Sequence, residues 1–329
     1  MVQPKVLRFA LISCLFLAAL TASAQVVATS PYQVSVFATS IPGVDFAPDS
    51  IAVVDGFVFI GYGDNATTTG GGTSTIVEYT LSGEMVHTYT VPGHNDGIKV
   101  NPNTKLIWAM QNEDGNPNLV IIDPKTQSQT EYTFGPTPHG GGYDDIVFRG
   151  NDVFLSASNP KHNPNTKPSI VKAEIVGKTV SVSPVLLGDA NAIDIPTNKV
   201  VQLNLQDPDS MILDPFGDVV LDSQADGELI IVHDPGADDL SAYHLRLSLK
   251  GSPVQIDDTI FATSSYGVIL AADRDGETVY AITRNIFAPN AAYSAAPHAL
   301  TELDMNTGVL TPVVTGFVNL HGMAFIPAP

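Results

Sequence analysis

Cysteine, tryptophan and basic residues are scarce in this chain of 329 residues. The one cysteine, Cys14, lies in the N-terminal leader described below, so the rest of the chain offers no disulfide, no thiolate metal site and no cysteine nucleophile. Stretches with helical spacing of apolar residues are also few, which argues against a helical fold. Without disulfides, the hydrophobic core alone must stabilise the protein, and about 305 residues are enough for that.

The N-terminal segment has the pattern of a secretory signal peptide. Lys5 and Arg8 precede twelve apolar residues, 9–20, and Ala22, Ser23 and Ala24 match a small-x-small cleavage pattern. The sequence therefore predicts a signal peptide over 1–24 and one domain over 25–329. The apolar stretch is shorter than the roughly 20 residues that cross a bilayer. No later segment replaces it, so we expect a secreted or periplasmic protein without a membrane span.

The charge balance limits the partners of the mature chain. Without Lys5 and Arg8, 13 basic and 34 acidic residues remain, a net charge of −21 with histidine neutral. Such a surface repels phosphate backbones and anionic lipid, so we expect no nucleic-acid partner and instead a small molecule or a protein. Carboxylates are also the hard oxygen ligands that calcium prefers, although solubility alone is the simpler interpretation of the charge.

Short β-forming runs and a repeated motif dominate the rest of the sequence. Runs rich in Val, Ile, Tyr, Phe and Thr, such as 57–60 and 228–232, alternate with Gly, Pro, Asn and Asp clusters. Six segments share a polar residue, a small or polar residue and then an apolar β-former. Their first residues are spaced by 47, 48, 65, 49 and 63 positions. The segments are Asp49-Ser50-Ile51, Asp96-Gly97-Ile98, Asp144-Asp145-Ile146, Asp209-Ser210-Met211, Asp258-Thr259-Ile260 and His321-Gly322-Met323.

Each repeat continues with a turn, a strongly apolar strand and two further strands, which is typical of a propeller blade. The apolar strands cover 57–61, 106–110, 153–155, 219–221 and 268–271. We therefore expect an all-β fold, a β-propeller of about six four-stranded blades, with five and seven as the alternatives. A strand near 33–37 should pair with the C-terminal motif and close the ring. The expected loop insertions are 159–168, 189–196 and 286–297.

Two stretches resemble the six-bladed propellers of the NHL-repeat and SMP-30/gluconolactonase-like group. They are Asp209-Ser210-Met211 with residues 215–220, and Gly322-Met323-Ala324-Phe325. The resemblance implies the fold and, from the gluconolactonase-like enzymes, a divalent metal held by Glu, Asn and Asp at the pore mouth. Those ligands do not align here residue by residue, and no Glu opens an inner strand.

Propeller geometry converts the repeat into a site. The first strand of each blade lines the central channel, so residues that open the motif meet residues that follow the second strand at one pore mouth. The candidate ligand-binding residues are Asn65, Gln111, Asn112, Asn159, Gln224, Asp273 and Arg274. The candidate metal ligands are His94, Asp96, His139, Asp144, Asp209, Asp258 and His321.

Both kinds of metal ligand have a simpler alternative. Three histidines around a pore could hold zinc with an open position, or they could be loop residues hydrogen-bonded to the backbone. A ring of carboxylates repels unless a cation such as calcium neutralises it, but an Asp before a strand also closes Asx turns. Calcium is the first expected cofactor and zinc the second.

The pattern favours an exported propeller that binds a small ligand, a metal ion or a partner at its pore mouth without catalysis. The alternative is a metal-dependent lactone or ester hydrolase of the gluconolactonase type. There a divalent ion would polarise the carbonyl and an Asp or His would act as base. A metal at the pore mouth distinguishes the two, because the hydrolase requires it.

Overall fold

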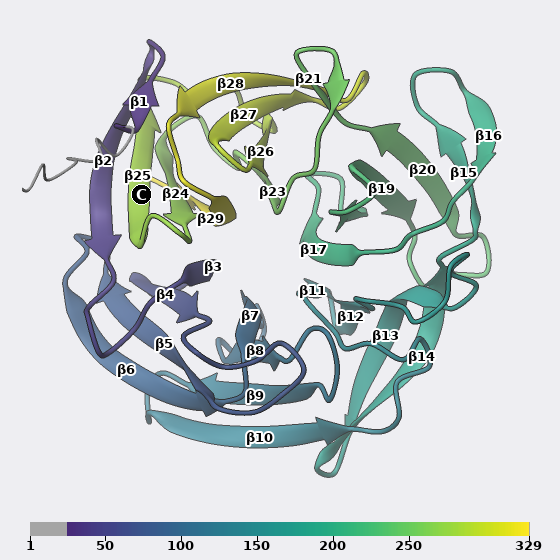
Figure 1. Cartoon of the computed structure of the whole chain (residues 1–329), viewed down its shortest axis with the longest axis horizontal. Helices are drawn as coiled ribbons and strands as arrows, with labels where there is room; N and C mark the ends of the chain where they lie inside the picture. The colour runs from purple at the N-terminus through teal and green to yellow at the C-terminus, as the bar shows by residue number, and fades with distance from the viewer. Residues whose placement is uncertain (1–24, 329) are drawn as a thin grey trace, which may run out of the picture.

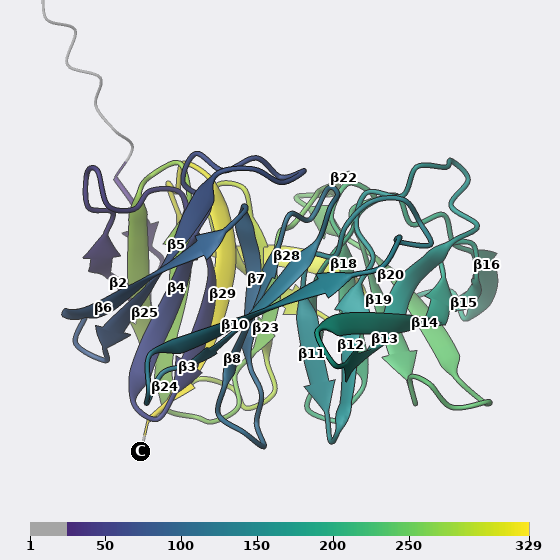
Figure 2. The same cartoon turned by 90° about the horizontal axis from the view of Figure 1, so that it is seen from below.

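The computed structural model describes residues 25–328, in which every regular element is a strand. The expected leader, 1–24, lies outside the described residues. The strands form six blades of four around a central channel, as Figure 1 shows, and Figure 2 shows the same disc from its edge. Among the described residues, no helix is long and apolar enough to cross a membrane. The fold expected from the sequence, an all-β propeller, is confirmed.

The first three blades follow the expected order, each strand pairing with the next one in sequence. Blades 2 and 3 are further joined at their outer edges by a parallel pairing. From inner to outer strand, blade 1 is β3 (Pro48–Val54), β4 (Phe57–Tyr62), β5 (Thr73–Thr80) and β6 (Met85–Pro92); blade 2 is β7 (Asn95–Val100), β8 (Ile107–Gln111), β9 (Asn118–Asp123) and β10 (Ser128–Phe134); blade 3 is β11 (Ile146–Arg149), β12 (Asp152–Ser156), β13 (Pro168–Val176) and β14 (Thr179–Leu187).

Blade 4 carries an extra hairpin on its outer strand. The blade is β17 (Pro208–Leu213), β18 (Val219–Ser223), β19 (Glu228–His233) and β20 (Ser241–Arg246). The hairpin is β15 (Asn191–Asp194) with β16 (Lys199–Gln202), and β15 pairs in parallel with β20. The expectation of a loop over 189–196 was therefore wrong in part. The other insertion, 159–168, is a loop until β13 begins at Pro168.

Blades 5 and 6 exchange strands in a way that the repeat did not predict. Blade 5 is β23 (Thr259–Phe261), β26 (Ala292–Ala296), β27 (Ala299–Asp304) and β28 (Val309–Thr315), edged by β1 (Val27–Ala28), β21 (Ser248–Leu249) and β22 (Ser252–Pro253); blade 6 is β29 (Leu320–Pro327), β24 (Gly267–Asp273), β25 (Thr278–Arg284) and β2 (Tyr32–Thr39). After β23 the chain thus supplies two strands to blade 6 before it returns to blade 5.

This exchange corrects three expectations. The apolar strand 268–271 belongs to blade 6, and the supposed loop 286–297 contains β26, the second strand of blade 5. The ring is closed because N-terminal β2 and C-terminal β29 share a blade, but β2 pairs with β25 and not with β29. The N-terminal segment supplies one blade strand only, so the remaining two strands of blade 6 must come from elsewhere.

The hydrophobic core is divided among the blade interfaces. Six buried clusters occur, and each joins the facing sides of two neighbouring blades. The second strand of each blade shows how the core is divided, because a neighbouring blade covers each of its two faces. In β4, for example, Phe59 packs toward blade 2 and Ile60 toward blade 6. Apolar residues therefore run continuously along these strands instead of alternating.

The small second residue of the motif follows from the close approach of neighbouring inner strands. A Cβ on Gly97 would lie 2.4 Å from the carbonyl oxygen of Asp144 in the next blade. A Cβ on Gly322 would lie 2.6 Å from the carbonyl oxygen of Asp49. The motif therefore records the packing around the channel as well as its chemistry.

The N-terminal strand is held by a polar cluster at the junction of blades 5 and 6. The Tyr32 hydroxyl lies 2.7 Å from Nη1 of Arg284 and 3.0 Å from the Tyr293 hydroxyl, and it also bonds to Glu302. Arg284 pairs separately with Glu302 at 2.8 Å. The cluster thus connects β2, β25, β26 and β27.

Tyr32→Phe is expected to lower the free energy of unfolding by about 1–2 kcal/mol, because it removes the shared hydroxyl and leaves buried partners without it. Urea denaturation measures the change. Tyr266→Phe is the matched control, since that side chain is 60% exposed. Equal stability of the two variants would show that the cluster does not hold the N-terminal strand.

Candidate functional site

A cavity of about 230 Å³ opens at the end of the channel where the inner strands begin. The residues that open the motif all line it, as the sequence predicted. The lining carries nine carboxylate side chains but only three cationic ones: Asp49, Asp96, Glu113, Asp114, Asp144, Asp207, Asp209, Asp257 and Asp258, against Lys99, Arg274 and His321. The pore mouth is therefore strongly acidic.

The register of the fifth motif is shifted by one residue from the predicted one. In blade 3, Ile146 pairs with Leu155, and the preceding Asp144 and Asp145 bond to Ser156. In blade 5 the same contacts are made by Thr259 with Ser294, and by Asp257 and Asp258 with Ala295. The ring position of blade 5 is thus occupied by Asp257, not by Asp258.

Asp258 has a structural role that the shifted register explains. Its Oδ2 accepts a hydrogen bond from the backbone N–H of Met323 in blade 6 at 2.7 Å. Asp145, at the same position in blade 3, accepts one from Met211 in blade 4 at 2.8 Å. Both carboxylates tie neighbouring inner strands together. The position in the ring that the motif assigned to Asp258 is thus held by Asp257, and both side chains line the cavity.

Three consecutive blades supply a group of carboxylates with no cationic member. Single oxygens of Asp96, Asp144 and Asp209 all lie within 4.8 Å of one another. Burial raises the pKa of Asp144 well above its ordinary value, and the neighbouring Asp209 and Asp96 raise it further. Burial and Asp257 do the same to Asp209, and burial with Asp49 and Glu113 raises the pKa of Asp96 to about 8. We call this group the carboxylate triplet.

The other three blades supply a group that is already neutralised. Nδ1 of His321 lies 2.9 Å from Asp257 and 3.5 Å from Asp49, and Arg274 lies 3.4 Å from Asp49. Burial favours the neutral forms of Asp49 and His321, but the ion pairs outweigh this effect. They lower the pKa of Asp49 to about 2 and raise that of His321 to about 11. His321 is therefore already held by two carboxylates, and a metal ion at this histidine would have to displace its proton.

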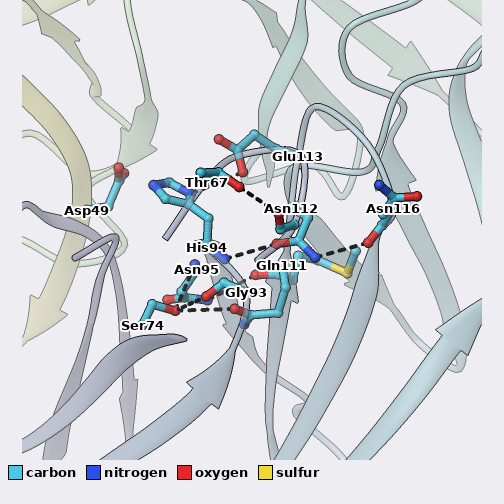
Figure 3. Close-up of polar contacts among 12 residues, drawn as sticks. Asp49, Thr67, Ser74, Gly93, His94, Asn95, Gln111, Asn112, Glu113 and Asn116 are labelled. Carbon is cyan, nitrogen blue, oxygen red and sulfur yellow. Dashed lines mark hydrogen bonds and ion pairs between the residues drawn. The ribbon is translucent and has the colours of Figure 1, made fainter. Parts of the chain in front are cut away.

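A third group shares Asp96 with the carboxylate triplet and adds His94, which directly precedes β7, and Glu113, on the loop that follows β8. Nδ1 of His94 is 3.1 Å from Glu113, and its Nε2 is 3.4 Å from Nη2 of Arg274. Burial lowers the pKa of His94, but Glu113 outweighs it and the net shift is upward. Figure 3 shows this histidine pointing toward Asp49 across the mouth. Glu113 was not predicted, although it directly follows a predicted residue, Asn112.

Two predicted ligand-binding amides instead support His94. Asn112 Oδ1 accepts the backbone N–H of His94 at 2.9 Å, and its Nδ2 donates to the carbonyl oxygen of Asn116 at 3.0 Å (Figure 3). Gln111 is fully buried, and Ser74 links it to the carbonyl of Gly93. Neither side chain lines the cavity, so both act as scaffold for the loops that do.

The remaining predicted residues divide into those at the mouth and those away from it. Gln224 and Arg274 line the cavity, and Gln224 donates to Asp257 at 2.8 Å. Asp273 is buried and accepts backbone N–H groups of Val318 and Asn319. Three others do not line the cavity: Asn65, Asn159 and His139.

The structure does not bring three imidazoles together. His139 is buried, its Nε2 lies 2.6 Å from the carbonyl oxygen of Gly142, and its ring packs on Tyr143. His94 and His321 fall in different groups of candidate metal ligands, each with one histidine. The hypothesis of a three-histidine zinc site therefore has no geometric basis among residues 25–328. The alternative, a loop histidine bonded to the backbone, describes His139.

The pore mouth is thus electrostatically divided. One half pairs its acids with Arg274 and His321, whereas no carboxylate of the triplet forms an ion pair with a lysine or arginine among the described residues, and Asp96 alone lies within 4.8 Å of a ring nitrogen of His94. Close carboxylates must either keep protons or gain a cation. The triplet offers hard oxygen atoms from three rigid strands, the donor set that suits calcium or magnesium more than zinc.

Comparisons with known proteins bear on the fold. No protein-family model matches this chain, and no curated protein matches its sequence. A candidate gluconolactonase of known structure is 8% identical, with a TM-score of 0.50 over 88% of this chain and 83% of that one. The periplasmic gluconolactonase of Pseudomonas aeruginosa is 10% identical, with a TM-score of 0.48 over 86% and 89%.

A streptogramin B lyase is also similar, at 13% identity and a TM-score of 0.47 over 91% of this chain and 74% of that one. At identities this low, structural likeness speaks for the arrangement of strands and not for chemistry. The chain shares the β-propeller fold with the candidate gluconolactonase.

Proposed function

We propose that this protein is an exported propeller that binds a divalent cation through Asp96, Asp144 and Asp209, and a small oxygen-rich ligand beside that cation, without catalysing a reaction. The carboxylate triplet is the observation that carries the proposal. Its three oxygens lie within 4.8 Å of one another near the starts of three neighbouring inner strands, and none of the three carboxylates is ion-paired with a lysine or arginine among residues 25–328.

Calcium suits this donor set best. Calcium takes six to eight oxygen ligands, more than three carboxylates supply. A cation here would therefore keep positions for water or for oxygen atoms of a ligand. Gln224, Glu113 and Arg274 line the same cavity and offer amide, carboxylate and guanidinium contacts to that ligand.

The histidines favour binding over hydrolysis. A hydrolase of the lactonase type needs a base that can take a proton from water. The pKa of His321 is raised to about 11 despite burial, because Asp257 and Asp49 surround it, so it holds its proton at neutral pH. His94 is likewise paired with Glu113. Neither imidazole is free to act as a base.

Calcium titration by calorimetry tests the proposal. Protein freed of metal by chelation is expected to bind one calcium ion, and Asp144→Asn to weaken that binding at least tenfold. Asparagine has the shape of the protonated aspartic acid, so the variant should fold. Asp114→Asn is the matched control, because Asp114 lines the same cavity but lies outside the triplet, and we expect less than a threefold change.

Failure has a clear form. If calcium, magnesium and zinc at millimolar concentration produce no heat and leave the melting temperature unchanged, the carboxylates hold only protons and the proposed cation site is wrong.

Hydrolysis remains the second candidate, because the carboxylate triplet and Arg274 line the same small cavity. A cation bound to the triplet would share this cavity with the Arg274 guanidinium. A metal and a guanidinium could together polarise an ester carbonyl. A panel of sugar lactones and simple esters tests it on the calcium-loaded protein. If the protein turns over one of these substrates, and Asp144→Asn abolishes turnover while Asp114→Asn retains it, the function is hydrolysis and not binding alone.

A further inference from the structure

A second cavity, of about 310 Å³, lies in the channel beyond the pore mouth, and we call it the lower channel. Its walls are side chains further along the inner strands than those of the mouth. Four residues, Ile51, Lys99, Asp258 and Met323, line both cavities and therefore form the partition between them. The lower channel is thus separate from the carboxylate triplet.

Apolar side chains form the walls of the lower channel. They include Phe148, Leu213, Phe261 and Phe325, each from a different inner strand. Two of these rings are held by edge-to-face packing, Phe148 on Trp108 at 5.2 Å and Phe325 on Phe287 at 5.2 Å. A concave, pre-formed apolar wall with few polar groups is typical of small-molecule sites.

The polar groups of the partition are already paired. Nζ of Lys99 lies 2.7 Å from Asp145 Oδ2, and Asp258 accepts the backbone N–H of Met323 at 2.7 Å. A further anion would meet the charges of Asp145 and Asp258, and a further cation would meet that of Lys99. An ammonium has three N–H donors, and Asp145 takes one, so Lys99 can still donate a hydrogen bond.

Two exposed aromatic residues lie in loops that follow lining strands of the lower channel. Phe216 is 85% exposed in the turn after β17, and Tyr266 is 60% exposed in the loop after β23. Both follow strands whose last residues, Leu213 and Phe261, line the cavity.

We propose that the lower channel binds an uncharged, largely apolar small molecule whose single acceptor oxygen takes a hydrogen bond from Lys99. The apolar walls would enclose the body of the molecule, and the paired partition excludes a net charge. This site is independent of the cation proposed at the mouth.

The neutral naphthalene ketone prodan is a suitable probe, because it has an apolar body and one carbonyl acceptor. Its fluorescence is expected to shift to the blue and saturate at one molecule per chain, with a Kd on the order of 10 µM for a ligand of this size. The anionic naphthalene ANS, similar in body but charged, should bind at least tenfold more weakly.

Thr263→Trp should weaken prodan binding at least tenfold, because Thr263 is exposed at the opening and lines the cavity. Thr311→Trp, on the outer strand β28, is the matched control and should leave the Kd unchanged. Lys99→Met should weaken binding about fivefold, and Asp114→Asn, at the mouth, not at all. Lys99→Met also removes the ion-pair partner of buried Asp145 and can therefore fail to fold. In that case the effect of Thr263→Trp on prodan binding decides whether the proposal holds.

Four results would overturn the proposal. Prodan that does not saturate, or that Thr263→Trp leaves bound, would show that the lower channel is not its site. ANS that binds as tightly as prodan would show that the cavity does not select uncharged molecules. Self-association of the chain that Thr263→Trp abolishes would assign this face to a second copy of the protein.

Discussion

Raising the pH of the chelated protein from 5 to 8 is expected to lower its free energy of unfolding by several kcal/mol. Asp144 and Asp222 are both buried, and burial raises the pKa of each well above the ordinary value. In the unfolded chain both carboxyls lose their protons above about pH 4. The folded state then binds more protons than the unfolded state, so the free energy of unfolding falls as pH rises, by up to about 1.4 kcal/mol per pH unit for each such group until its folded-state pKa is reached.

The neutralised half of the mouth does not reverse this trend. Asp49, with a pKa of about 2 set by its ion pairs against the effect of burial, is ionised across the whole range and adds no slope. His321, with a pKa of about 11, keeps its proton while the unfolded histidine loses one above about pH 6.5. Its contribution therefore also declines as pH rises.

Urea denaturation at several pH values, with chelator and then with calcium, measures the slope. Calcium should flatten it, because a cation at the carboxylate triplet replaces the protons. Asp222→Asn should reduce the pH dependence of the free energy of unfolding by the contribution of one carboxyl group. The variant should also be more stable than wild type at pH 8, since both Asp222 oxygens are buried without a hydrogen-bond partner. Stability that is constant or rises between pH 5 and 8 would contradict the assignment of neutral carboxyls.

Asp49→Asn is expected to destabilise the protein by about 3 kcal/mol, because it removes the buried anion that two partly buried cationic groups share. Arg274 and His321 lie 3.4 and 3.5 Å from the Asp49 carboxylate. The pKa of His321 should also fall measurably from its value of about 11, since one of its two counter-ions is lost.

An NMR titration of the His321 ring and urea denaturation read the two effects separately. Asp114→Asn, at the same mouth, serves again as the matched control, because it touches neither cation through an ion pair. A variant with wild-type stability and an unshifted imidazole would show that Asp49 does not organise this half of the mouth.

The repeat and the composition determined the fold class, and the reason is local. A four-stranded blade reproduces the same turn, the same buried second strand and the same close inner-strand contact each time, so its signal recurs in the sequence. The motif also placed Asp49, Asp96, Asp144, Asp209 and His321 at one pore mouth, because each opens the inner strand of its blade.

Pairing between distant strands decided what the repeat could not. The apolar run 268–271 looked like the second strand of blade 5, but pairing with β29 places it in blade 6. Thr259 stands where the motif expects an apolar residue, and its hydroxyl bonds to that of Ser294. The motif was therefore aligned one residue too late in blade 5, and it selected Asp258 in place of Asp257. The pair Asp257-Asp258, matching Asp144-Asp145, was the signal for the correct register.

Only the tertiary structure could divide the pore mouth into two unlike halves. Arg274 reaches the mouth from the loop after β24, and Glu113 from the loop after β8, so neither belongs to the repeated motif. The charge of one aspartate therefore depends on side chains far away in the sequence. The sequence by itself determined a ring of acidic positions; the folded structure decided which of them are paired with cations, because ionic pairing acts through space and not along the chain.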